Sequence, residues 1–543
     1  MATSRQLTSL LGGFPRFFLF AAALVGAMSA YFVVQFPRGI DTNWDLRNYH
    51  LATWVLFSRG DYFEHVAPAG TQYFLSPFLN AISSICYELL GLRIGGVAIA
   101  TLHALMMAVT VSLLSFLSLG SGRQLSTFDK TAVILAAILL SVAAPMPLGT
   151  MGTSFADNTL ALLLAILVWV TLRTGFAPNR FRPVWAATLL SLCLALKLTA
   201  FTFALAYGVS FYAIAFASCG PDQRFAIFKE IILFAVCSVL ATLILAGPWM
   251  TYVYYETGNP VFPYANNYFK SPLIDFSDMS DKRFLPSSIW QFFSYPWTAA
   301  TGRANVSEVP FADARYLIAA VIGASLLFSA VLPGRLWRTA GHADRTLDTP
   351  TWFLAIFLVL TLLLWRWTIS NQRYLAFADV LIAVLLVRMI ASFPRFLVTP
   401  SLVVVSAIHL RTAVIPDWEH RLPSQVAAGT TRKPPLLGEA LVFLGEKPMG
   451  YVVGLFGSRS RFILASTDQS HMDVDTSVAG PFAPRVRALI DRPFTNGIWV
   501  LYRGNGLSYS AAYLSGYGLK ISPECQGLQT FAENLILCKV DRS

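Results

Sequence analysis

The chain has 543 residues, of which 55% are hydrophobic and only 13% are charged, and its mean hydropathy is +0.58. Soluble domains carry roughly 25% charged residues, so the composition excludes an ordinary soluble protein and indicates a polytopic membrane protein. The formal net charge is +11, yet the sequence has no Lys- or Arg-rich block of the kind that binds nucleic acid. We therefore expect membrane lipids, and no nucleic acid, as partners.

Eleven apolar runs of about spanning length follow one another along the chain. They cover residues 17–36, 94–119, 130–146, 157–172, 184–200, 201–218, 227–248, 314–333, 351–367, 374–393 and 396–415. The first run has no evident cleavage site after it, so it predicts a retained span rather than a signal peptide. The division between the fifth and sixth runs is the least certain, because the two are nearly continuous.

Lys and Arg gather in alternate short loops, a bias that sets the orientation of membrane proteins. One side of the membrane would carry Arg173, Arg180, Arg182, Arg224, Lys229, Arg388 and Arg395. The opposite loop around 147–157 has neither Lys nor Arg. This pattern predicts a cytoplasmic N-terminus and two long outer segments, 37–93 and about 249–313. Helical spacing of apolar residues in the first segment is typical of interfacial helices, and such large outer segments favour a site at the outer face rather than a pore.

Beyond about residue 416, short alternating runs replace the long apolar ones. YVVGLFG, FILAST, GIWVLYR and LILCKV are separated by Gly, Pro, Asp and Ser clusters, which is typical of strands and turns. We expect a transmembrane domain over 1–415 and an outer α/β domain over 416–543. Cys525 and Cys538 lie in the outer domain and could form a disulfide in an oxidising compartment, although two free buried thiols are the alternative.

The stretch GIDTNWDLRNYHLATW brings ionisable side chains to the place where the first apolar run leaves the membrane. Asp41 and Asp45 are four residues apart, so a helix would put them on one face, and Asp45 and Tyr49 have the same spacing. His50 is a candidate for proton transfer, because histidine titrates near neutral pH. The alternative is an ordinary interfacial helix whose first turn is capped by Asp41 or Asn43.

Three more charged residues lie at the predicted outer ends of the spans. Asp157 is in MGTSFADNTLALLL, Lys197 in LCLALKLTAF, and Arg373 precedes Tyr374 in ISNQRYLAF. A buried ammonium is costly and usually has an anionic partner, although Lys197 could snorkel and Arg373 could anchor lipid headgroups. Together, these carboxylates and cations suit a transfer in which a base takes a proton and fixed cations stabilise a departing phosphate.

Other chemistry-bearing patterns are few. The charged group formed by Asp275, Asp278, Asp281, Lys282 and Arg283 fits a solvated loop, or a mobile loop that gates the site. The sequence contains no Walker motif, no CxxC pair and no HExxH. Nothing in it therefore indicates nucleotide hydrolysis or a zinc site.

These motifs, in this order, resemble the GT-C superfamily of membrane glycosyltransferases. The similarity is greatest to the bacterial branch related to protein O-mannosyltransferases and the lipid A aminoarabinose transferase. It covers roughly residues 15–395 and rests on WDLRNYHLATWVLFSRGDYF, TSFADNTLALLLAILVW, ALKLTAF, YYETGNPVFPYANNYF and NQRYLAF. We expect a GT-C-like polytopic α-helical membrane protein with about 11 transmembrane helices, interfacial outer helices and a C-terminal α/β periplasmic domain.

The resemblance implies roles for single residues. Asp45 matches the family's catalytic aspartate and would be the general base. Asp157 matches the second acidic position, and Lys197 and Arg373 match positions that face the carrier phosphate. Lys270 is a further candidate for binding the donor phosphate. The candidates for substrate binding are Tyr49, His50 and Tyr374.

One departure from the family pattern concerns metal binding. The nearest relatives have an acidic residue directly after the catalytic aspartate, whereas Leu46 stands there in this chain. Asp41 could compensate as a further catalytic carboxylate, or it could only be a cap. Asp45 alone cannot chelate a divalent metal, whereas Asp41, Asp45 and Asp157 together could. We expect no obligatory metal cofactor, with a divalent metal as the alternative.

The resemblance implies an inverting glycosyltransferase at the periplasmic face of a bacterial inner membrane. It would move a sugar from a polyprenyl-phosphate donor to a hydroxyl of a lipid, glycan or protein acceptor. A transporter or flippase of lipid-linked sugars is the alternative, but the sequence has no convincing internal repeat and its acidic residues gather at one face. A non-catalytic assembly partner would be favoured if Asp45 and Lys197 lay far apart.

Overall fold

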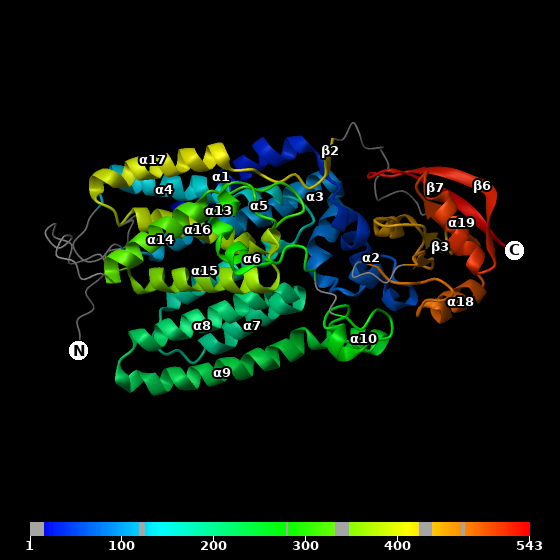
Figure 1. Cartoon of the computed structure of the whole chain (residues 1–543), viewed down its shortest axis with the longest axis horizontal. Coiled ribbons are helices and arrows are strands. Elements are labelled where there is room, and N and C mark those ends of the chain that lie inside the picture. The colour runs from blue at the N-terminus through cyan, green and yellow to red at the C-terminus, as the bar shows by residue number, and fades with distance from the viewer. Residues whose placement is uncertain (1–15, 119–124, 278–280, 332–346, 423–436, 468–472) are drawn as a thin grey trace.

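The computed structural model describes residues 16–118, 125–277, 281–331, 347–422, 437–467 and 473–543. A bundle of long helices makes up one part of the molecule, and a C-terminal sheet lies beyond one end of it (Figure 1). Between the bundle and the sheet lie short helices of the outer segments, among them α2 (Leu51–Arg59) and α10 (Gly247–Thr257). The structure thus has a middle layer, in which the candidate site is found.

Each of the eleven predicted apolar runs corresponds to a helix. These helices are α1 (Arg16–Ala30), α3 (Phe78–Ser112), α4 (Thr127–Val142), α6 (Asp157–Thr174), α7 (Arg182–Leu196), α8 (Phe201–Ser218), α9 (Pro221–Leu245), α14 (Arg315–Val331), α15 (Thr349–Thr368), α16 (Ala376–Ile390) and α17 (Arg395–Thr412). Within the described ranges, six helical segments are long and apolar enough to cross a membrane: Arg16–Arg38, Phe78–Phe116, Asp157–Thr174, Leu198–Ser218, Pro221–Leu245 and Thr349–Thr368. The helices are therefore as predicted, and their number as membrane spans stays a prediction.

Two helices show how the bundle uses its apolar residues. α16 lies at its centre, and every residue of this helix except Met389 is buried. α9 lies at the edge of the bundle (Figure 1), and only Ile227 and Glu230 of its 25 residues are buried. A helix that is apolar all round needs an apolar environment on every side. α16 finds it in neighbouring helices, whereas the exposed apolar face of α9 suits lipid.

The beginning of α3 differs from the prediction. We expected residues up to 93 to lie apart from the second span, whereas α3 begins at Phe78 and continues to Ser112. Gly91 interrupts the helix with φ 76° and ψ 166°, a conformation that glycine adopts at little cost because it has no Cβ. The kink joins the predicted outer helix directly to the span.

The C-terminal part is a five-stranded mixed sheet with the strand order β4-β3-β5-β7-β6. The strands are β3 (Leu441–Leu444), β4 (Arg461–Leu464), β5 (Ile498–Tyr502), β6 (Leu519–Gln529) and β7 (Asn534–Arg542). β3 is parallel to β4 and β5, and β7 is antiparallel to β5 and β6. FILAST, GIWVLYR and LILCKV contain strands as predicted, and α18 (Ala483–Asp491) and α19 (Leu507–Gly516) complete this α/β unit.

The prediction of a strand at YVVGLFG is wrong, because this run forms the 3-10 helix η11 (Gly450–Leu455). A Cβ atom added at Gly450 would lie 1.9 Å from the carbonyl oxygen of Asn48. This turn is therefore in close contact with the segment that leads into α2. Its apolar residues are buried by that tertiary contact, which a short run cannot distinguish from burial within a sheet.

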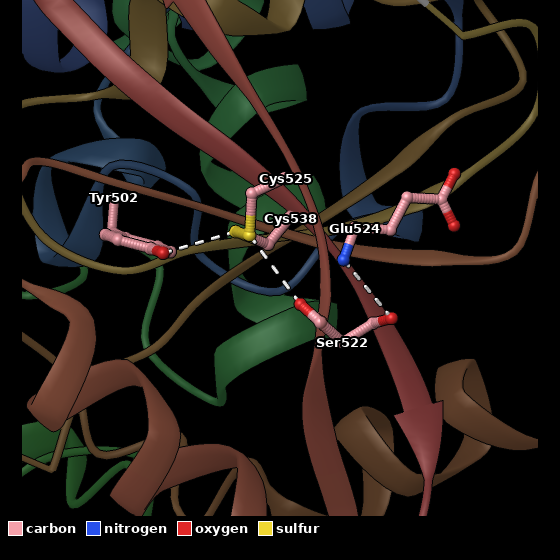
Figure 2. The surroundings of a disulfide bond; sticks show 5 residues. All are labelled: Tyr502, Ser522, Glu524, Cys525 and Cys538. Carbon is pink, nitrogen blue, oxygen red and sulfur yellow. Dashed lines mark hydrogen bonds between the residues drawn. A yellow bond between two sulfur atoms is a disulfide. The ribbon is translucent and has the colours of Figure 1, made fainter.

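A disulfide joins Cys525 of β6 to Cys538 of β7 (Figure 2). The two cysteines are directly opposite each other in the antiparallel register. The Tyr502 hydroxyl lies 3.2 Å from the Cys538 sulfur. The disulfide thus cross-links β6 and β7, the two longest strands of the sheet.

The sheet is tied closely to the first outer segment. Val66 forms a parallel bridge to Ile463 of β4, and Arg461 binds Asp61 at 2.9 Å and also Glu64. The chain between the bundle and the sheet also returns to this segment, because β2 (His420–Arg421) pairs with β1 (Ile40–Asp41). These contacts hold residues 40–66 between the sheet and the bundle, and this arrangement shapes the site.

Candidate active site

A cavity of about 520 Å³ lies between the bundle and the outer segments. Its apolar wall includes Leu75, Leu79, Leu198, Trp249 and Met250. Its polar wall includes Asn43, Asp45, Tyr49, His50, Asp157, Lys197, Tyr264, Asp281, Arg283, Glu308, Arg373, Tyr374 and Glu419. A cavity lined by both apolar and charged side chains suits an amphiphilic ligand.

Two carboxylates and two cations meet in the polar wall. Asp157, at the first turn of α6, lies 2.5 Å from the Lys197 ammonium, which follows the end of α7. Arg373 Nη1 donates to Asp45 Oδ2 at 3.0 Å, and its Nε lies 3.4 Å from Asp157 Oδ2. We call these four residues the charge cluster. Asp45 and Lys197, which the assembly-partner hypothesis required to be far apart, are joined through the other two members.

The charge cluster is largely shielded from solvent. The side chains of Asp157 and Arg373 are 3% and 8% exposed, and those of Asp45 and Lys197 are 13% and 20% exposed. Aromatic rings cover the cations: the Arg373 guanidinium lies 4.0 Å from the Phe155 ring centroid, and the Lys197 ammonium lies 4.0 Å from that of Tyr374. Such cation–π contacts stabilise a desolvated cation. The low exposure strengthens every charge interaction within the cluster.

The position of Arg373 is set by its neighbours in the turn η9 (Gln372–Leu375). Asn371 Oδ1 accepts a hydrogen bond from the Arg373 backbone N–H at 3.1 Å. The Gln372 side chain is buried, accepts from the Tyr295 hydroxyl at 2.6 Å and donates to Asp379 at 2.8 Å. These hydrogen bonds fix the backbone from which the Arg373 guanidinium projects into the cavity.

Asp45 lies at the beginning of a π-helical turn, Leu46–His50, which leads into α2. Asn43, not Asp41, caps this turn, since its Oδ1 accepts from the backbone N–H of Leu46 at 2.8 Å. The predicted spacing of Asp45 and Tyr49 brings the Tyr49 hydroxyl to 3.5 Å from Asp45 Oδ2. Within the described part of the chain, both polar contacts of the Asp45 carboxylate use Oδ2.

Asp41 does not share a helix face with Asp45, contrary to the prediction. It belongs to strand β1, is buried, and does not line the cavity. Its carboxylate accepts from the backbone N–H groups of Asn43 and Ser154 at 3.0 and 2.7 Å, and from the Tyr87 hydroxyl at 3.1 Å. Because β1 is extended, the four-residue spacing carries no helical meaning there. Asp41 thus holds the outer segment against the loop before α6.

Lys270 also lies apart from the charge cluster. It is exposed at the end of the short helix α11 (Asn266–Phe269), and its ammonium is 5.6 Å from the Phe276 ring centroid. Lys270 is not among the residues that line the cavity, although Tyr264, six residues earlier, is. The structure therefore does not support Lys270 as a ligand of a phosphate held by Lys197 and Arg373.

Several cavity residues were not singled out from the sequence, or were interpreted otherwise. Glu308 lines the cavity and accepts a hydrogen bond from Asn371 at 3.1 Å. Asp281 and Arg283 line it too, although the sequence favoured a solvated loop; their neighbour Asp278 lies outside the described residues. Glu419 comes from the chain leading to the sheet and pairs with Arg47 at 2.6 Å. Asp281 and Arg283 belong to the loop for which gating of the site was the alternative, whereas no pattern in the sequence indicated that Glu308 and Glu419 reach the cavity.

His50 is buried, and its Nδ1 lies 2.8 Å from the Ser154 hydroxyl. Burial lowers the His50 pKa to about 4, and this outweighs the opposing effect of Asp45. The imidazole is therefore neutral between pH 5 and 8, so it can accept or donate a hydrogen bond but does not carry charge there.

The low His50 pKa gives a testable pH dependence of stability. In the unfolded chain the His50 pKa is near 6.5, so the unfolded state binds a proton that the folded state does not as pH falls toward 4. The free energy of unfolding should therefore decrease over this window, by roughly 3 kcal/mol from His50 alone. The apparent melting temperature, followed by tryptophan fluorescence, should fall less in His50→Gln than in the wild type. Identical slopes for the two proteins would contradict this account.

Comparison with known proteins bears on the fold. No family model and no curated protein matches the sequence. Among the solved structures that match, two do so over 96% of this chain and 97% of their own: ArnT from Cupriavidus metallidurans in the apo state, and the same protein bound to undecaprenyl phosphate. The TM-scores are 0.52 and 0.51, with sequence identities of 14% and 13%. This chain has the ArnT fold.

The ArnT fold accounts for the whole architecture, since the match includes both the helical bundle and the C-terminal sheet. The resemblance inferred from the motifs agrees with this match in fold. At 13% identity the likeness assigns no residue of this chain a role. Those roles are argued from the geometry of the charge cluster.

Proposed function

We propose that this chain is an inverting glycosyltransferase that moves a sugar from a polyprenyl-phosphate donor to an acceptor hydroxyl. The observation that carries the proposal is the charge cluster of Asp45, Asp157, Lys197 and Arg373 in a cavity that apolar side chains also line. The ArnT fold supports it, because one ArnT structure holds undecaprenyl phosphate. The protein would act at the periplasmic face of a bacterial inner membrane, with its N-terminus in the cytoplasm and the sheet in the periplasm.

In this mechanism the donor phosphate binds beside Lys197 and Arg373, and the prenyl chain follows the apolar wall. The acceptor oxygen attacks the anomeric carbon, and the bond from that carbon to the phosphate oxygen breaks. Asp45 takes the proton of the attacking hydroxyl, and polyprenyl phosphate leaves with the bonding electrons. Fixed cations stabilise the charge that develops on the leaving phosphate, and Asp45 supplies general-base catalysis.

The lining of the cavity supports this division of roles. Leu79, Trp249 and Met250 offer apolar contacts but no charge, so they suit the lipid. Tyr264, Arg283 and Glu308 line the polar wall beside the charge cluster and offer hydrogen bonds to sugar or acceptor hydroxyls. The side chains of Asp157 and Arg373 are largely buried, so little water reaches them. This matters because water competes with the acceptor as nucleophile.

The carboxylates do not fit a metal site. Asp45 and Asp157 are paired with Arg373, Asp157 also binds Lys197, and Asp41 is directed to backbone N–H groups elsewhere. In the ranges that the structure describes, no group of three His, Cys, Asp or Glu side chains could hold a metal ion. We therefore assign the stabilisation of the phosphate to Lys197 and Arg373.

This assignment predicts that transfer survives removal of metal. Treatment with EDTA, followed by exchange into metal-free buffer, should leave the rate of polyprenyl phosphate release within about twofold of the untreated rate. A parallel sample that receives Mg²⁺ or Mn²⁺ after chelation is the control. Loss of activity on chelation, with recovery on adding either ion, would show that a divalent metal is required.

The proposal is tested with purified protein in lipid nanodiscs and a panel of polyprenyl-phosphate sugars. The measurement is release of free polyprenyl phosphate, with an envelope extract supplying acceptors. Release from one donor by the wild type would establish a transferase and name that donor. No release from any donor, with lipid-linked sugar instead moved across the bilayer of sealed vesicles, would favour a flippase.

A further inference from the structure

The charge cluster has no net positive charge that would attract an anion. The carboxylates of Asp45 and Asp157 balance the cations Lys197 and Arg373. Asp45 is held by a hydrogen bond from Arg373 Nη1 at 3.0 Å, and both side chains are largely buried. A phosphate added to this arrangement would meet two carboxylates at short range, and like charges in a desolvated site repel each other by several kcal/mol.

Arg373 nevertheless has hydrogen-bonding capacity left. Among the residues that the structure describes, its buried Nε has no hydrogen-bond partner, and neither does Asp157 Oδ2 beside it. A buried guanidinium donor without an acceptor is costly. Arg373 lines the cavity, stacks on Phe155 and projects from the fixed turn η9. An acceptor oxygen supplied by a ligand would complete its hydrogen bonds.

From these two observations we infer that Asp45 occupies, on Arg373, the place of the donor phosphate, and that the phosphate displaces it. The inference rests on the proposed function and adds a second role for Asp45. Arg373 binds a carboxylate through one N–H at present, whereas a phosphate can accept two parallel N–H bonds from a guanidinium. The exchange breaks one ion pair, forms another, and involves no covalent change.

The exchange has a consequence for the order of events. While Asp45 is paired with Arg373, its Oδ2 accepts the Arg373 hydrogen bond and is not free to accept one from an acceptor hydroxyl. Once the phosphate has taken Arg373, Asp45 is released beside the bound donor, at the moment when a base is needed. The same ion pair would keep small anions out of the cavity. The geometry thus couples binding of the donor to the availability of the base.

This coupling predicts that a substitution which removes the base tightens binding of the lipid. Asp45→Asn abolishes the competing charge, so its dissociation constant for undecaprenyl phosphate should be at least about tenfold lower than that of the wild type. Asp45→Glu retains the charge and should bind no more tightly than the wild type. Affinity would be measured in phosphatidylcholine nanodiscs with purified undecaprenyl phosphate as the probe, after melting curves show that each variant is folded.

The matched control is Glu419→Gln, which removes one negative charge from the same cavity but from a carboxylate paired with Arg47. Its affinity for undecaprenyl phosphate should stay within about twofold of the wild type, because it does not compete for Arg373. Equal tightening in Glu419→Gln and Asp45→Asn would reduce the effect to the overall charge of the cavity and overturn the inference. Unchanged or weaker binding of undecaprenyl phosphate by folded Asp45→Asn would also overturn the inference. If the wild type still bound the lipid in that experiment, the proposed function would not be contradicted. No binding by the wild type would contradict both.

Discussion

Replacing Asp45 with asparagine is expected to lower the turnover of sugar transfer by about a thousandfold, because general-base catalysis contributes roughly 10² to 10⁴ in rate. The side chain keeps its shape and can still accept a hydrogen bond from Arg373, which also remains near Asp157. The substitution leaves Lys197 and Arg373 with one carboxylate, so the melting temperature should fall, although less than in Asp157→Asn, because Asp157 pairs with both cations and Asp45 with one. The measurement is release of polyprenyl phosphate under saturating donor, together with a melting curve of the same sample.

Asp41→Asn is the informative comparison, because Asp41 and Asp45 were both predicted from the sequence as candidate catalytic residues. Asp41 accepts hydrogen bonds from Ser154 and Tyr87 and does not reach the cavity. Its loss should lower stability by about 1 to 3 kcal/mol, as expected when a buried charged acceptor is removed, and reduce turnover per folded molecule far less than loss of Asp45. If Asp45→Asn turned over within threefold of the wild type, Asp45 would not be the base.

Replacing Asp157 with asparagine is expected to destabilise the fold by about 3 kcal/mol, because breaking a buried ion pair leaves uncompensated charge. Asp157 is 3% exposed and faces both Lys197 and Arg373, so one substitution leaves two cations with one carboxylate. Lys197 is 20% exposed, which lets solvent screen part of the cost and sets our figure at the lower end of the range. The apparent melting temperature and the denaturant midpoint should both fall.

A double-mutant cycle with Lys197→Met separates this charge effect from a loss of packing. Asp157→Asn combined with Lys197→Met restores one carboxylate to one cation, so the double variant should be more stable than Asp157→Asn alone. Lys197→Met alone should be destabilised less, since Asp157 keeps Arg373 as a partner. A double variant that is no more stable than Asp157→Asn would show that unpaired charge is not the cause.

Much of the fold could be predicted from local pattern. The eleven apolar runs all contain helices, and three of the four predicted strand segments are strands. Apolar runs and turn residues depend on neighbours close in sequence, so one chain suffices to recognise them. The prediction of a strand at YVVGLFG was wrong because this run is buried by contact with the segment before α2. The early start of α3 was missed because the kink at Gly91 lets the predicted outer helix continue directly into the span.

The residues of the candidate site could be predicted from the sequence, but their contacts with one another could not. Asp157, Lys197 and Arg373 stood out because a charge at the end of an apolar run is costly and needs a partner. That argument identifies residues but not the pairs they form. The pairing of Arg373 with Asp45 joins positions 328 residues apart, and it exists only because η9 and the π-helical turn face the same cavity.

The sequence by itself therefore determined the class of protein, the helices and most of the sheet, and it named all four residues of the charge cluster as candidates. Only the tertiary structure decided that Asp45 pairs with Arg373, that Asp41 and Lys270 do not line the cavity, and that Glu308 and Glu419 do. The physical reason is the distance along the chain over which each effect acts. Propensity, periodicity and the cost of burying a charge act along the chain, whereas a site is made by the backbone path that brings distant segments together.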